Sequence, residues 1–116
     1  MKTWQLWEGT KSWTGENDYE VYEFEGEQLG VWKVPTEYLE PYSDVTYYVY
    51  QTKSGCIIIQ CVEKENRLGG SQYSAIFEYD TLADAAKDGY DEVLYNMRVT
   101  GNSDLVKEWR ERWLNS

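Results

Sequence analysis

The segment 45–63 (VTYYVYQTKSGCIIIQCVE) constrains the fold more than any other part of the sequence. Residues 45–52 and 56–63 are both strand-length and rich in Val, Ile, Tyr and Thr, which favour β-structure. The connection between them, Lys53-Ser54-Gly55, is short and contains glycine, as a β-hairpin requires. The sequence therefore predicts a hairpin around which the rest of the chain is organised.

The second strand of this hairpin is apolar on both faces. Successive side chains of a strand point to opposite sides, which places Ile57, Ile59 and Cys61 on one face and Cys56, Ile58, Gln60 and Val62 on the other. A strand of this kind is typical of the middle of a covered sheet. We therefore expect 56–63 to be a central strand with other parts of the chain packed on each side.

The segment 16–27 is the most distinctive polar stretch, with six carboxylates and no basic residue. A single bulge near residues 21–22 would bring Tyr19, Val21, Tyr22 and Phe24 onto one face and the carboxylates onto the other. The sequence thus predicts a strand with one apolar and one anionic side. The residues predicted to contact a partner are Glu16, Asp18, Glu20, Tyr22, Glu23, Glu25, Glu27 and Trp13.

The segments around this acidic stretch are assigned from turn residues and alternation. Residues 3–8 alternate as a first strand, and residues 8–17 have the composition of a turn or loop. Trp13 within that loop is either a plug folded over the core or an exposed contact residue, and we favour the plug. A turn at 25–27 is predicted to separate the acidic strand from a further strand at 28–34, which Pro35 ends.

The second half of the chain changes from strand to helix. Residues 73–80 alternate as a strand, and Thr81 is placed to cap a helix whose apolar residues recur at helical spacing to Met97. Gly89 lies on the apolar stripe of that helix, which predicts close approach to the sheet; the alternative is a break into two short helices. Ser103 and Asp104 begin a last helix, with Trp109 and Trp113 on its apolar face.

Together these elements predict an α+β fold, a mainly antiparallel sheet of five to six strands with two C-terminal helices packed on one face. At 116 residues the chain is expected to form a single domain. It has no apolar run long enough to span a membrane and no signal-peptide layout at its start, so we expect a cytoplasmic protein without membrane contact.

The net charge of −10 is concentrated in residues 1–44, which hold ten acids and three lysines. Direct nucleic-acid binding depends on Lys and Arg side chains that neutralise the phosphates. A concentration of acids therefore disfavours it. An acidic surface suits a basic protein partner, or serves solubility alone.

The composition also restricts catalysis and metal binding. The chain has no histidine, which removes the commonest general base and the usual zinc centres. Cys56 and Cys61 lie about 16 Å apart on one predicted strand and point to opposite faces, too far for a disulfide and unable to share a metal. We therefore expect two reduced, packed cysteines, no metal site and no cofactor.

Part of the chain resembles the uncharacterised bacterial EXLDI family, named for its terminal motif. The resemblance covers residues 47–55 (YYVYQTKSG), 78–82 (EYDTL) and a helix that closes with Val106-Lys107-Glu108. Trp109-Arg110-Glu111 stands where the family has Leu-Asp-Ile. The resemblance implies the same order of strands and helix, and it implies no activity.

Three functions are compatible with these observations. The first is a non-catalytic inhibitor of antitoxin, immunity or anti-defence type, possibly mimicking nucleic acid, that docks its anionic strand on a basic surface of a partner such as a nuclease. The second is a binding module for a flat ligand such as a sugar or nucleobase, suggested by six tryptophans and eleven tyrosines. The third is a hydrolase using Glu23 with Asp18 or Glu25. We predict the first and leave the oligomeric state open.

Overall fold

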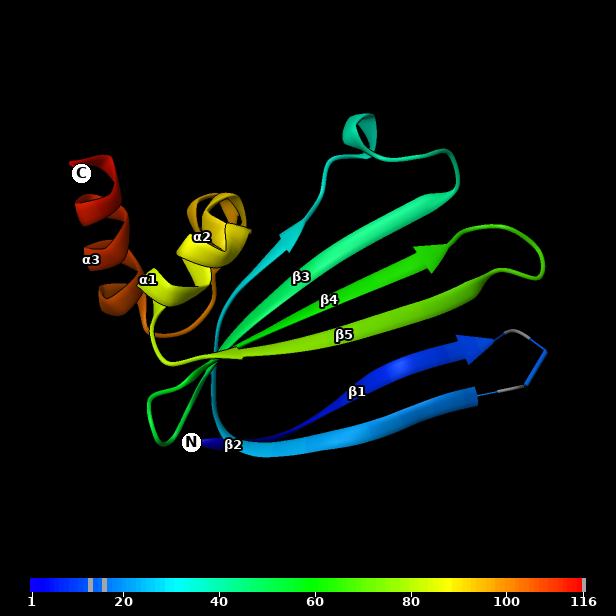
Figure 1. Cartoon of the computed structure of the whole chain (residues 1–116), viewed down its shortest axis with the longest axis horizontal. Helices are drawn as coiled ribbons and strands as arrows, with labels where there is room; N and C mark the ends of the chain where they lie inside the picture. The colour runs from blue at the N-terminus through cyan, green and yellow to red at the C-terminus, as the bar shows by residue number, and fades with distance from the viewer. Residues whose placement is uncertain (13, 16, 116) are drawn as a thin grey trace.

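The computed structural model describes residues 1–12, 14–15 and 17–115. The strands are β1 (Lys2–Ser12), β2 (Asn17–Lys33), β3 (Ser43–Thr52), β4 (Ile57–Glu65), β5 (Ser71–Tyr79) and β6 (Arg98–Val99). The helical elements are the 3₁₀ turn η1 (Thr36–Tyr38), α1 (Leu82–Ala85), the π-helical turn η2 (Ala86–Tyr90), α2 (Asp91–Asn96) and α3 (Ser103–Leu114). Figure 1 shows α1, α2 and α3 gathered at one end of the strands, β1 and the first part of β2 below β5, and the last part of β2 on the upper side of β3.

The strands of the described chain form one six-stranded sheet in the order β1-β5-β4-β3-β2-β6, and β1 also pairs with β2. Because β1 has β5 on one side and β2 on the other, the first five strands close into a small barrel to which β6 is added. Every pairing is antiparallel. The predicted antiparallel α+β fold is confirmed, whereas the closure of the sheet was not anticipated.

β2 is one continuous strand that serves two partners. Up to Gly26 it pairs with β1, and from Gly26 to Lys33 it pairs with β3. A Cβ atom at Gly26 would lie 2.1 Å from the carbonyl oxygen of Gln51, so only glycine allows β3 to approach here. The predicted turn at 25–27 is therefore wrong, because Gly26 marks a change of pairing partner and not a reversal of the chain.

Side chains of the central hairpin supply two separate cores. On the helix side, Val49, Ile57 and Ile59 pack with residues of all three α-helices, among them Leu82, Leu94, Val106 and Trp109. On the opposite side, Leu6, Tyr50 and Ile58 fill the barrel together with Trp4, Phe24, Tyr48 and Ile76. The prediction of a central strand covered on both faces is thus confirmed for β4, which lies between β3 and β5.

The helix after β5 starts as predicted but does not continue unbroken. The Thr81 hydroxyl accepts a hydrogen bond from the Asp84 backbone N–H at 3.1 Å, which confirms the cap. Gly89 has φ +102° and no atom within 4 Å of the place where a Cβ would stand. The predicted close approach to the sheet is therefore wrong, and the alternative break is confirmed, because the left-handed backbone of Gly89 separates α1 from α2.

Short polar contacts position the last helix. Asn102, rather than Ser103, caps α3 by accepting a hydrogen bond from the Leu105 N–H at 3.3 Å. The Arg110 guanidinium donates to the carbonyl oxygens of Leu94 and Met97 at 3.0 and 2.7 Å, which satisfies acceptors at the end of α2.

Nowhere in the described chain is there a helix with the length and apolar character that crossing a lipid bilayer requires.

Two glycine substitutions should separate the barrel contact from the helix break. Gly26→Ala should lower the free energy of unfolding by about 3 kcal/mol or more, because the new methyl group meets the β3 backbone. Gly89→Ala should cost only about 1–2 kcal/mol, the strain of a left-handed backbone in open space. Urea denaturation measures both changes, and equal losses would contradict the role assigned to Gly26.

Candidate functional site

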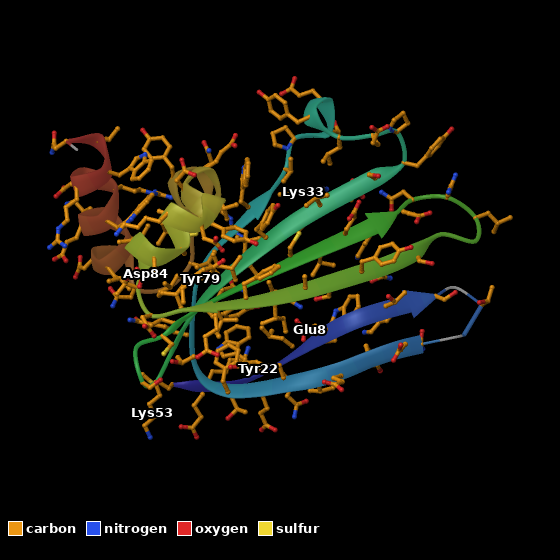
Figure 2. The ribbon with its side chains drawn as sticks, viewed as in Figure 1. Glu8, Tyr22, Lys33, Lys53, Tyr79 and Asp84 are labelled. Atoms are coloured by element: carbon orange, nitrogen blue, oxygen red, sulfur yellow. The ribbon has the colours of Figure 1, made fainter. Side chains whose placement is uncertain are left out.

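The predicted contact residues lie on a two-stranded arm that consists of residues 2–12 of β1 and residues 17–26 of β2. The two segments pair without interruption from Lys2 opposite Gly26 to Lys11 opposite Asn17. Glu8 and Tyr22 are seen on this arm in Figure 2. A regular ladder means that strict alternation decides which side chains share a face.

The arm carries carboxylates on both faces, which corrects the sequence prediction. The expected bulge near residues 21–22 is absent, since the register shows no shift there. Asp18 and Glu20 therefore share a face with Tyr22 and Phe24, while Tyr19, Val21, Glu23 and Glu25 share the other. The predicted strand with one apolar and one anionic side is wrong. Trp13 and Glu16, also predicted as contact residues, lie outside the described residues.

The carboxylates of the arm differ in how far they are neutralised. Glu25 forms an ion pair at 3.6 Å with Lys53, which lies in the turn that joins β3 and β4. Asp18, Glu20 and Glu23 are exposed, and none of them belongs to an ion pair within the described residues. Glu27 is half-buried beyond the bend of β2. The unneutralised negative charge therefore gathers on the part of the arm farthest from Gly26.

The two lysines of the arm lie over aromatic rings. Lys2 Nζ is 4.3 Å from the centre of the Trp4 ring. Lys11 Nζ is 4.5 Å from the centre of the Trp7 ring and 4.8 Å from that of Tyr19. Within the described residues, both ammonium groups thus contact aromatic rings and neither forms an ion pair.

Two carboxylates of the arm stand directly opposite each other. Glu8 faces Glu20 in the ladder, an arrangement of like charges that destabilises a sheet. The Glu8 carboxylate accepts a hydrogen bond from the Ile76 backbone N–H at 3.0 Å, which lies beyond the last residue of β5 that pairs with β1. Glu8 thus has a structural role on β5, whereas Glu20 has no hydrogen-bond or ion-pair partner among the described residues.

Apolar side chains stand exposed among these carboxylates. Val21 is 60% exposed, Tyr19 41% and Tyr22 36%. The Tyr22 hydroxyl donates to Glu78 at 3.3 Å, and partial burial together with that carboxylate raises the pKa of the tyrosine. The far part of the arm therefore combines negative charge with uncovered apolar area.

Of the two carboxylate pairs in the hydrolase hypothesis, the structure separates one and keeps the other on one face of β2. Asp18 and Glu23 lie on opposite faces of β2, and Glu25, which shares a face with Glu23, is bound to Lys53. In the described part of the chain, no three acidic or cysteine side chains are grouped so that they could hold a metal ion. Both cysteines are free thiols and partly buried.

A second group of aromatic side chains, on the helix side of the sheet, was not singled out from the sequence. Trp32 stacks on Tyr47, with ring centres 6.0 Å apart, and Tyr90 contacts the rings of Tyr47, Phe77 and Tyr79. Burial raises the pKa of Tyr47 to about 12, with Cys61 beside it as a smaller cause. The signal available in the sequence was alternation along each strand. It puts Tyr47 on one face of β3 and puts Phe77 and Tyr79 together on one face of β5. Their meeting with Tyr90 depends on the break at Gly89.

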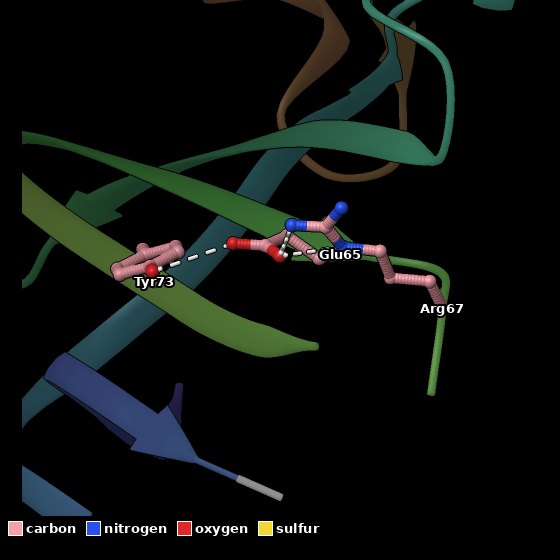
Figure 3. Close-up of polar contacts among 3 residues, drawn as sticks. All are labelled: Glu65, Arg67 and Tyr73. Atoms are coloured by element: carbon pink, nitrogen blue, oxygen red, sulfur yellow. Dashed lines mark hydrogen bonds and ion pairs between the residues drawn. The ribbon is translucent and has the colours of Figure 1, made fainter. Parts of the chain in front are cut away.

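Glu65 illustrates a carboxylate whose charge is already used within the protein. It accepts hydrogen bonds from Arg67 Nη2 at 3.2 Å and from the Tyr73 hydroxyl at 3.4 Å (Figure 3). The cluster fixes the connection between β4 and β5. Asp18, Glu20 and Glu23 of the arm differ from Glu65 in forming no ion pair with any residue that the structure describes.

Comparison with known proteins gives no relative, since no family model, no curated protein and no solved structure matches the chain. The resemblance to the EXLDI family therefore stays a prediction.

Removing the charge of Glu20 should stabilise the protein. Glu20→Gln should raise the free energy of unfolding by about half a kcal/mol at low salt, because it ends the repulsion with Glu8, and the gain should shrink at high salt. Glu23→Gln is the matched control, since Glu23 is exposed on the same strand but stands opposite Gln5. Urea denaturation at two ionic strengths gives both values; equal gains would show that only net charge matters.

Ionisation of Tyr47 should weaken the fold at high pH. Its pKa is raised from 10.0 to about 12 in the folded protein. The stability that the neutral hydroxyl contributes is therefore fully present below the pKa of the unfolded chain, 10.0, and is lost as pH rises toward 12. Tyr47→Phe should therefore lose less stability between about pH 9 and about pH 11 than the native chain does. Tyr38→Phe, at an exposed tyrosine of η1, is the control. Identical pH profiles for Tyr47→Phe and the native chain would contradict the assignment.

Proposed function

We propose that the protein is a non-catalytic binding protein of inhibitor, antitoxin, immunity or anti-defence type. Its arm docks on a basic surface of a partner such as a nuclease. The observation that carries the proposal is the set of exposed, unneutralised carboxylates Asp18, Glu20 and Glu23 around the exposed side chains of Tyr19, Val21 and Tyr22.

Charge and apolar area have separate roles in such docking. Exposed carboxylates attract a cationic groove over a distance of about a Debye length and accelerate association. Val21 and the two tyrosines then supply the apolar contact that holds the complex together. Because carboxylates lie on both faces of the arm, it suits insertion into a groove better than flat contact with one surface.

The repulsion between Glu8 and Glu20 supports a role outside the folded chain. A residue that costs stability and has no internal partner is expected where a partner supplies the compensation. A cation of the partner placed near Glu20 would remove this repulsion on binding. Alternating carboxylates on a strand also place charges about 6.6 Å apart, a spacing within the range of a phosphate backbone, which is the basis for suggesting nucleic-acid mimicry.

The proposal is tested by affinity capture from a lysate of the organism that encodes the chain. The arm variant carries Asp18→Asn, Glu20→Gln and Glu23→Gln. The matched control carries Glu37→Gln, Glu40→Gln and Glu108→Gln, three exposed acids away from the arm with the same change in net charge. A partner of the native protein should bind the arm variant at least about tenfold more weakly and the control unchanged.

The salt dependence of the captured partner completes the test. Its affinity for the native protein should fall as salt rises, and this fall should be shallower for the arm variant. Equal retention of the partner by both variants at low and moderate salt would exclude the arm as the docking site.

A further inference from the structure

A cavity of about 250 Å³ lies between the arm and the inner face of the sheet. Gln5, Leu6 and Trp7 of β1 form one side of it, and Tyr48, Gln60 and Lys64 lie on the other. An apolar protein cavity of about 150 Å³ is large enough to hold benzene. The space between arm and sheet is therefore large enough for a single ring with small substituents.

Among the described residues of β4, Gln60 has the one buried polar side chain. It lies inside the barrel with 4% of its surface exposed. Its Nε2 donates to the Trp7 carbonyl oxygen at 3.3 Å and to the Ser74 hydroxyl at 3.1 Å. The Ser74 hydroxyl in turn donates to the same Trp7 carbonyl at 2.6 Å. A carbonyl only accepts hydrogen bonds, so this network fixes the amide with its nitrogen toward Trp7 and its oxygen away from it.

The Gln60 amide oxygen takes part in no hydrogen bond within the described chain. Every fully buried side-chain nitrogen or oxygen of the described residues has a hydrogen-bond partner. The amide oxygen is therefore not sealed in the protein, and the cavity that Gln60 lines is the space it reaches. A held acceptor with both lone pairs available accepts from water, or from the N–H or O–H group of a ligand that displaces that water.

The remaining lining defines the shape and polarity of an occupant. Leu6, Tyr50 and Val62 are buried and supply apolar walls. The Tyr48 ring stands directly opposite Gln60 in the ladder and offers a flat surface beside the amide. Gln5, Lys64 and Gln72 are exposed at the rim and carry N–H donors. The cavity thus has one acceptor in its depth, the Tyr48 ring beside it, a lining that is more polar than apolar, and donors around its opening.

We propose that this cavity is a binding site for a small planar lactam with the hydrogen-bonding edge of uracil. The ring N–H donates to the Gln60 amide oxygen, the ring lies along Tyr48, and the carbonyl oxygens beside the N–H accept from donors at the rim. This site is separate from the carboxylates of the arm, so it does not depend on the docking function proposed above.

The first test uses the native protein and two ligands that differ in the required donor. Uracil should shift the side-chain amide signals of Gln60 in nitrogen–proton NMR spectra. Dimethyluracil, in which both ring nitrogens carry methyl groups, should bind at least about tenfold more weakly, since it has no N–H to donate. Equal binding of both ligands, or no response to uracil at millimolar concentration, would overturn the proposal.

The second test uses variants and a competing class of ligand. Gln60→Met removes the acceptor and should abolish the preference for uracil over dimethyluracil, while Gln51→Met, the same change at a glutamine of β3 outside the cavity, should keep it. If Gln60→Met does not fold, the comparison of the two ligands on the native protein still decides the matter. A response to glucose at the Gln60 amide that exceeds the response to uracil would assign the cavity to a polyol and overturn the lactam proposal.

Discussion

The burial of β4 on both faces is the constraint on which the rest of the structure depends. Ile57, Ile58 and Ile59 are each at most 1% exposed, and covering one such side chain contributes about 1.5–3 kcal/mol. Because neighbouring residues of a strand point in opposite directions, no single layer can cover all three. The chain supplies helices for Ile57 and Ile59 and the arm for Ile58.

The arm can cover the inner face of the sheet only because β2 changes partner at Gly26. The missing side chain lets the β3 backbone approach, and the same strand continues from the arm into the sheet without a turn. This continuity fixes the orientation of every carboxylate on the arm. The far part of the arm, with Asp18 and Glu20, is held to the sheet because residues 9–12 of β1 pair with residues 71–74 of β5. The proposed docking surface and the barrel core are therefore consequences of one strand geometry.

The proposed lactam site arises where Gln60 and Ser74, the two buried polar residues of the described chain, interrupt the apolar interior. A buried amide in a core is costly unless its groups are satisfied, and in this barrel the nitrogen of Gln60 is satisfied twice while its oxygen is not. The arm covers β4 and buries Ile58. Two residues further along the strand, the same arm leaves the cavity beside Gln60. The acidic arm and this cavity use different chemistry, so one protein could engage a macromolecule and a small ligand independently.

The sequence by itself determined the features that depend on neighbours along the chain. Alternation in 45–52 and 56–63 was enough to predict the hairpin, the faces of Ile57 and Ile58 and the central place of β4, and the spacing of Thr81 and Asp84 was enough to predict a helix start. The acidic composition of 16–27 was equally plain. What only the tertiary structure decided was pairing between distant segments: the regular β1–β2 ladder that sets Asp18 and Glu23 on opposite faces, the closure of β1 on β5, and the open space around Gly89. Strand register and the room around a glycine are set by residues far away in sequence, and local periodicity carries no information about them.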